Sequence, residues 1–120
     1  MITVVAYGLA IVLNLFIIFI GARFLLVPEA AAAGYGVPAT ASAYLTVKGV
    51  RDLTYGLVGL ALLASAGAPA EAWFMLVVAI APFGDTLIVL RHGGTKAVAF
   101  GIHFATAVTV LISAALLFAL

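Results

Sequence analysis

Four long apolar segments dominate the sequence and restrict what the chain can fold into. They run from about Ile2 to Phe24, Tyr44 to Ala66, Trp73 to Leu90 and Ala97 to Leu120. Each approaches the roughly 20 residues that a helix needs to cross the hydrocarbon core of a bilayer. With 68% hydrophobic and 8% charged residues, the chain lacks the polar surface of a soluble domain. We therefore predict an all-α membrane protein, a single domain over residues 1–120 in which four transmembrane helices form a bundle.

The positive charges indicate an orientation. Arg23, Lys48 and Arg51 flank the first predicted connection, Arg91 and Lys96 flank the third, and neither the termini nor the second connection has any. The positive-inside rule assigns such a side to the cytoplasm. We predict both termini on the non-cytoplasmic side of a multi-pass protein, in a bacterial-type inner membrane or a plasma membrane.

The composition also excludes several classes of function. Without cysteine, the chain has no disulfide, no thiol redox couple and no cysteine-bound cluster or zinc. Two histidines and scattered carboxylates do not form a metal-site pattern, and a net charge of +1 gives no reason to expect a nucleic acid partner. We expect no metal and no cofactor. The expected partners are the lipid bilayer and an apolar or amphipathic small molecule, and a homo-oligomer is one way to complete a pocket between short helices.

One polar residue in each predicted helix falls at a similar depth in the membrane. At about 1.5 Å per residue from the predicted cytoplasmic ends, Asn14, Asp52, Asp85 and His103 share a layer about 9 to 14 Å below the surface. Ionisable groups inside a membrane are costly, so each suggests a functional site. The shared depth favours one common site over unrelated helix contacts.

A polar stripe on the second predicted helix has members three and four residues apart: Lys48, Arg51, Asp52, Tyr55 and Gly59. Such a stripe must face the protein interior rather than lipid. Lys48 and Asp52, four residues apart, are able to pair with each other, whereas Arg51 needs a carboxylate from another helix. Asp85, at a matching depth, is its predicted partner.

Each of these residues also has a purely structural interpretation. Lys48 is typical of an interfacial cation that extends its ammonium toward the headgroups. Arg51 and Asp52 suit polar contacts between helices, and Asp85 suits the cap of a helix that restarts after a proline kink. His103 suits a hydrogen bond between helices.

The outer halves of the predicted helices offer few polar groups. Glu71, beside Trp73, is expected in water at the outer membrane interface. Hydroxyls such as that of Thr106 often bond back to their own helix. This scarcity favours a pocket closed toward the outside over a polar path that continues to Glu71.

Three segments resemble a known family. They are GARFLLVP at 21–28, GYGVP at 34–38 and KGVRDL at 48–53. In them the chain resembles a family of small four-helix integral membrane proteins of unknown function, in the wider DoxX-like group. The resemblance covers most of the length and implies fold and membrane location. It implies no specific activity, because the redox associations of DoxX-like proteins do not transfer residue by residue.

The first class of function that these residues suggest is a cofactor-independent membrane enzyme acting on an apolar or amphipathic substrate. Asp52 and Asp85 are its predicted general acid and base, Arg51 stabilises charge, and His103 or Tyr55 relays protons. A protonated carboxyl in an apolar pocket suits isomerisation, epoxide opening (a hydrolase reaction) or cation-initiated cyclisation.

Three further residues complete the predicted site as substrate-binding groups: Asn14, Lys48 and Thr106. The second class of function is a non-catalytic binding, transport or assembly subunit that uses the same charges for ion coupling or helix contact. The sequence alone leaves the choice between the two classes open.

Overall fold

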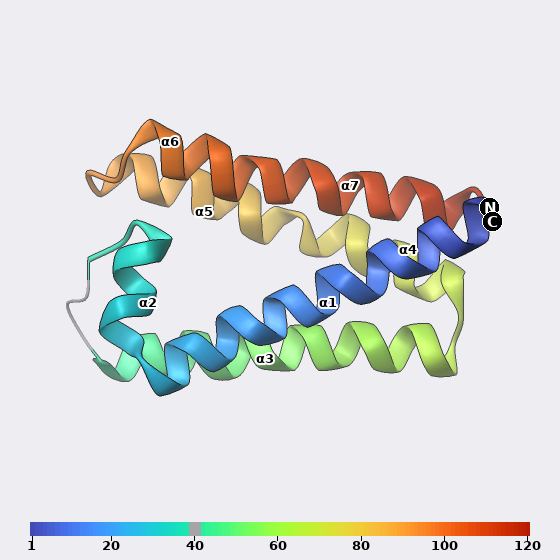
Figure 1. The fold of residues 1–120 in the computed structure, drawn as a ribbon, viewed down its shortest axis with the longest axis horizontal. Helices are drawn as coiled ribbons and strands as arrows, with labels where there is room; N and C mark the ends of the chain where they lie inside the picture. Colours follow the sequence, from blue (N-terminus) through green and yellow to red (C-terminus); the bar gives the residue numbers. More distant parts are fainter. Residues whose placement is uncertain (39–41) are drawn as a thin grey trace.

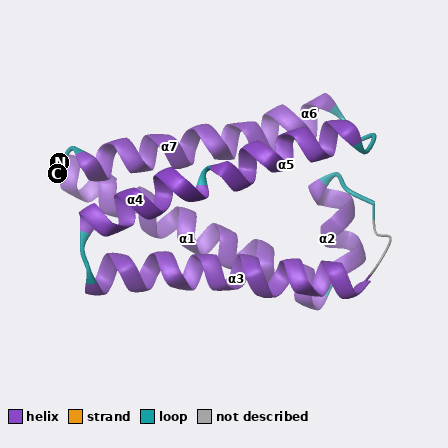
Figure 2. Ribbon diagram, turned by 180° about the vertical axis from the view of Figure 1, so that it is seen from behind, coloured by secondary structure: helices purple, strands orange, loops and turns teal. Residues whose placement is uncertain are grey.

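The protein is almost entirely helical in a computed structural model that describes residues 1–38 and 42–120 (Figure 1). The elements in chain order are α1 (Ile2–Leu26), α2 (Pro28–Tyr35), α3 (Ser42–Ser65), α4 (Ala68–Val78), α5 (Ile80–Arg91), α6 (Lys96–Val98), the π-helix η1 (Ala99–Phe104) and α7 (Ala105–Phe118). The described residues contain no strand, as Figure 2 shows. The all-α prediction is confirmed for this part of the chain.

Three helical stretches among the described residues are long and apolar enough to cross a membrane. They are Ile2–Leu26, Ala68–Arg91 and Lys96–Phe118. The protein therefore has the character of a membrane protein. The helix α3 has 24 residues but carries three charged side chains in its first half, so it differs in composition from the other three.

The third predicted span is a broken helix that begins at Ala68 rather than at Trp73. Pro82 lacks an N–H and its ring crowds the carbonyl of the preceding turn, which explains why α4 ends at Val78 and α5 starts at Ile80. Asp85 lies inside α5, so the interpretation of Asp85 as a helix cap is wrong. The N-cap residue of α5 is Ala79.

The helices α1 and α3 lie side by side and meet through glycines (Figure 1). A Cβ atom on Gly21 would lie 2.5 Å from the backbone nitrogen of Leu53 and 2.7 Å from the carbonyl oxygen of Gly49. A Cβ atom on Gly56 would lie 2.6 Å from the carbonyl oxygen of Asn14. Small residues of this kind allow two membrane helices to bring their backbones into contact.

The second layer of the bundle consists of α4 and α5 packed against η1 and α7. The two layers meet at the end where both chain termini lie, through a core that includes Ala10, Leu63, Met75 and Leu117. Toward the opposite end they separate, and α2 runs across the opening between them (Figure 2). The two layers are therefore packed together near the termini and are separated at the end that α2 covers.

Candidate functional site

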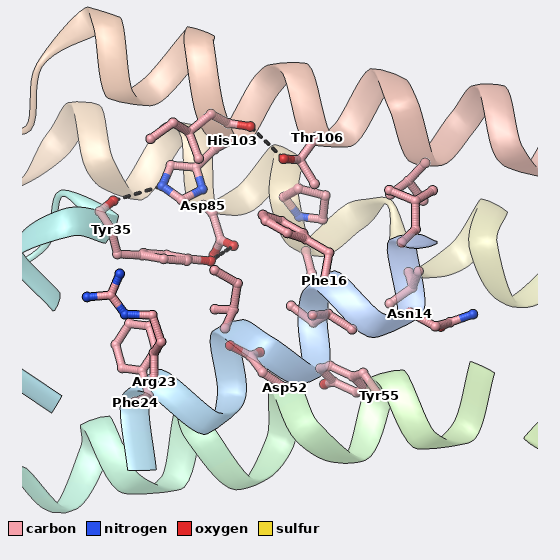
Figure 3. A pocket seen from close by; sticks show the side chains of 18 of the residues that line it. Asn14, Phe16, Arg23, Phe24, Tyr35, Asp52, Tyr55, Asp85, His103 and Thr106 are labelled. Carbon is pink, nitrogen blue, oxygen red and sulfur yellow. Dashed lines mark hydrogen bonds between the residues drawn. The ribbon is translucent and has the colours of Figure 1, made fainter. Parts of the chain in front are cut away.

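A cavity of about 420 Å³ lies between the two helix layers, beside α2. Its volume is in the range of small-molecule binding sites, which is roughly 300 to 1,000 Å³. Most of its wall is apolar, with side chains such as Phe16 and Ile17 of α1 and Phe74 and Met75 of α4. Figure 3 shows the polar residues of the wall gathered around this space.

Polar side chains from α1, α2, α3, α5, η1 and α7 line the cavity: Asn14, Arg23, Tyr35, Asp52, Tyr55, Asp85, His103 and Thr106. The structure thus brings together six of the eight residues that the sequence suggested for the site. The exceptions are Arg51 and Lys48. Tyr35 and Arg23 are additions that residue-by-residue reasoning did not assign to the site.

Tyr35 is the last residue of α2 and inserts its ring between the layers. Gly36 follows in the left-handed conformation, with φ of 86°, and turns the chain away. The Tyr35 hydroxyl donates a hydrogen bond to Oδ2 of Asp85 on α5. Burial raises the pKa of Tyr35, and the nearby charge of Asp85 raises it further. The phenol therefore keeps its proton and acts as a hydrogen-bond donor.

His103 lies in the π-helix η1 and is buried against the same tyrosine. Its Nε2 lies 2.8 Å from the carbonyl oxygen of Tyr35, and the two rings have their centroids 4.2 Å apart. A carbonyl only accepts, so Nε2 carries the hydrogen and Nδ1 of the neutral ring keeps a lone pair. A π-helical turn changes the direction in which a side chain points, and such turns are frequent at functional sites.

Lys48 and Asp52 form the pair that their spacing suggested, which is confirmed by a distance of 2.7 Å between Nζ and Oδ2. The Lys48 ammonium also lies 4.2 Å from the centroid of the Tyr35 ring and 5.0 Å from that of Phe24. Lys48 is therefore bound within the protein rather than extended toward headgroups. The Lys48 side chain does not line the cavity, so its position does not support the predicted contact between Lys48 and a substrate.

Arg51 does not pair with Asp85, and this prediction is wrong. Arg51 is exposed and is not on the cavity wall, and the described residues show no ion pair for it. The cause is the rotation of α3. Gly49 faces α1, and two residues further along the helix Arg51 is turned by about 200° from that contact. The partner of Asp85 is Tyr35, and the cation on the wall is Arg23.

Glu71 is completely buried, contrary to its predicted position in water. Nδ2 of Asn14 donates to Oε1 of Glu71 at 2.8 Å and to the carbonyl oxygen of Ala10 at 2.9 Å. Because the helix starts at Ala68, Glu71 and Trp73 lie on different faces of α4, and only Trp73 is exposed. Polar contacts therefore continue from the cavity wall at Asn14 to the terminal half of the bundle.

Thr106 and Tyr55 border the cavity at less buried positions. The Thr106 hydroxyl donates to the carbonyl oxygen of Ile102 at 2.6 Å, a bond within its own helix. Tyr55 is 41% exposed, and no hydrogen bond to its hydroxyl is seen within the described part of the chain. Both residues lie at the rim rather than at the polar centre formed by Tyr35, Asp85 and His103.

Comparison with known proteins gives one family. The model of a domain of unknown function, DUF4267, matches residues 14–117, which is most of the chain and all but one of the residues lining the cavity. The chain belongs to the DUF4267 family. This agrees with the predicted membership of a family of unknown function. No curated protein and no solved structure matches the chain.

Proposed function

We propose that this DUF4267 protein spans the membrane four times with both termini on the non-cytoplasmic side, as part of the wider DoxX-like group. The two termini lie together at one end of the bundle (Figure 1), and α2 lies at the other. All five Lys and Arg side chains belong to the helix ends and connections of the α2 side. A helix of 24 residues measures about 36 Å, so α3 is long enough for the fourth span.

Reporter fusions test this topology. A reporter that is active only outside the cytoplasm should be active when fused after Leu120. A reporter that is active only in the cytoplasm should be active when inserted in the connection after α5. The reverse result would contradict the orientation.

We further propose that the cavity binds an apolar or amphipathic small molecule taken from the bilayer. The observation that carries this proposal is the division of the cavity wall, which is apolar over most of its area and polar around Tyr35, Asp85 and His103. Such a division fits a ligand with an apolar body and one polar group. Phe16 and Ile102, both on the wall, are 41% and 42% exposed. They would lie toward lipid, which gives the ligand a side entrance.

The polar groups of the cavity support acid and base chemistry without a cofactor. Asp85 accepts a hydrogen bond from Tyr35, and Asp52 forms an ion pair with Lys48. The tautomer of His103 that donates to Tyr35 leaves Nδ1 as a base. A donor, a base and carboxylates around one apolar space suit proton transfer to and from one substrate, as in an isomerisation, an epoxide opening or a cyclisation.

In this mechanism Asp85 and Asp52 exchange protons with the substrate. Tyr35 positions Asp85, and His103 is oriented by the carbonyl of Tyr35 so that its Nδ1 takes up or returns a proton. Arg23 provides a positive charge near the α2 end of the cavity, the role that the sequence assigned to Arg51. The apolar wall excludes water from the reacting group.

Binding or transport without turnover is the second candidate function, and one observation favours it. The contact between Asn14 and Glu71 extends the polar groups beyond the cavity toward the terminal end. A closed pocket needs no such extension. Turnover distinguishes the two, because a binding or transport protein returns the ligand chemically unchanged.

The proposal is tested by the molecules that the purified protein retains. The protein is extracted in mild detergent, and bound amphiphiles are identified by mass spectrometry. Gly34 lies on the cavity wall with no atom within 4 Å of an added Cβ, so Gly34→Leu should fill the cavity without disturbing the fold. Gly8 is equally unobstructed and lies away from the cavity, which makes Gly8→Leu the matched control.

We expect the wild-type protein and Gly8→Leu to retain the same small molecule, and Gly34→Leu to lose most of it. Equal retention by both variants, or no retained molecule in the wild type, would contradict binding in this cavity.

A further inference from the structure

Glu71 is a buried carboxyl that the proposed acid and base chemistry does not use. It lies in the first turn of α4 with 0% exposure. Its Oε1 accepts from Asn14 at 2.8 Å, and its Oε2 has no hydrogen-bond partner in the described part of the chain. An unpaired oxygen on a fully buried carboxyl is unusual, because buried polar atoms are nearly always hydrogen-bonded.

Within residues 1–38 and 42–120, no Lys or Arg side chain forms an ion pair with Glu71. The ion pair found among the described residues is that of Lys48 and Asp52, and all Lys and Arg side chains belong to the other end of the bundle. The hydrogen-bond partner of Glu71 is the uncharged Asn14 on α1, and α7, which packs against α4, carries the buried and uncharged Ser113. A buried carboxylate without a partner costs several kcal/mol, whereas a neutral carboxyl avoids that cost.

The hydrogen bond from Asn14 by itself favours the ionised carboxyl, so the neutral form rests on the burial of Glu71 and on its unpaired oxygen. The bond does indicate which oxygen of a neutral carboxyl would hold the proton. The Asn14 amide nitrogen donates to Oε1, which therefore has the role of the carbonyl oxygen. The proton then belongs on Oε2, the oxygen that has no donor. The Ser113 hydroxyl is the second buried side-chain atom without a partner in the described residues, and it lies on a helix that packs against α4.

Glu71 also lies between two hollow parts of the bundle. Asn14, its partner, lines the main cavity. One helical turn before Glu71, Ala68 lines a recess of about 340 Å³ at the terminal end, together with Thr3 and Tyr7 of α1. Glu71 itself lines neither space, but its hydrogen-bond partner lines the first and a residue one turn before it lines the second.

We propose that Glu71 is a proton-binding site, separate from the carboxylates of the cavity, that holds its proton on Oε2 at neutral pH. This site is defined by the burial and contacts of Glu71 and does not depend on the identity of the cavity ligand.

Infrared spectroscopy of the full-length protein in phosphatidylcholine nanodiscs tests the proposal. The chain has two glutamates, Glu71 and the exposed Glu29. Labelling glutamate with carbon-13 at the carboxyl therefore identifies a protonated glutamate in the wild-type protein without any substitution. We expect a glutamic acid carbonyl band at neutral pH that disappears in Glu71→Gln and remains in Asp52→Asn.

Transfer to D2O measures the exchange. The Glu71 band should shift to the frequency of the deuterated acid, and the control Gly8→Leu should leave this shift unchanged. The absence of a protonated glutamate band in the labelled wild type would overturn the proposal. A band that never shifts would overturn proton exchange at Glu71. A failure of ligand binding in the cavity would leave all of these spectra unaffected.

Discussion

The hydrogen bond between Tyr35 and Asp85 gives the sharpest test of the site's geometry. Tyr35→Phe removes only the hydroxyl and leaves Oδ2 of Asp85 without its donor. Hydrogen bonds to charged groups contribute about 1.5 to 3 kcal/mol. Asp85 is half-buried, so solvent compensates part of the loss and favours the lower half of that range. We expect Tyr35→Phe to lower the free energy of unfolding by about 2 kcal/mol.

The double-mutant cycle isolates the contact itself. Asp85→Leu leaves the phenol of Tyr35 without its acceptor and should cost about 1 to 3 kcal/mol. The double variant replaces both partners by apolar groups and should cost less than the sum, with a coupling energy of about 1.5 to 2 kcal/mol. Reversible unfolding in mixed micelles, followed by circular dichroism, measures all four proteins.

A second cycle with Arg51→Met and Asp85→Leu is the matched control. It should be additive within about 0.5 kcal/mol, because Arg51 is exposed and makes no contact with Asp85. Additivity of the Tyr35 cycle, or strong coupling in the Arg51 cycle, would refute the assignment of Tyr35 as the partner of Asp85.

Three further predictions follow from the same structure. Asp52→Asn or Asp85→Asn should lower turnover of the retained ligand on the order of 100-fold or more while the protein stays folded. Full activity in both variants would show that these carboxylates have only a structural role. Gly21→Leu should lower the free energy of unfolding by about 3 kcal/mol, because its Cβ would meet the backbone of α3, whereas Gly8→Leu should change it by less than about 0.5 kcal/mol. The raised pKa of Tyr35 means that the folded protein holds this proton after the unfolded chain has lost it, so stability should fall as pH rises above about 10, and a titration of Tyr35→Phe should show a smaller fall.

Features that depend on position along a helix were accessible from the sequence. The length of the apolar segments indicated the helices, and a constant rise per residue allowed depths to be compared between them. Asn14, Asp52, Asp85 and His103, which this counting placed in one layer, all line the same cavity. The pairing of Lys48 with Asp52 also followed from spacing within one helix.

The rotation of each helix about its axis and the contacts between residues distant in sequence could not be predicted from the sequence. The glycine contacts between α1 and α3 fix the direction of Arg51, and no spacing within α3 indicates that contact. Tyr35 enters the site because α2 folds across the end of the bundle, and its signal in the sequence was its place in the segment GYGVP at 34–38, which resembles a known family. Glu71 was assigned to water because the start of α4 was placed too late. Pro69 marked the true first turn.

An amphipathic molecule in the cavity should place its polar group beside the carboxylates of Asp52 and Asp85. An experimental density map of the wild-type protein purified in mild detergent tests this most directly. We expect elongated density that follows the apolar wall past Phe16 and Ile17 and ends within hydrogen-bond distance of Asp85 or Asp52. A cavity that contains only separate water-sized peaks, or one that is filled by the protein's own side chains, would contradict the account.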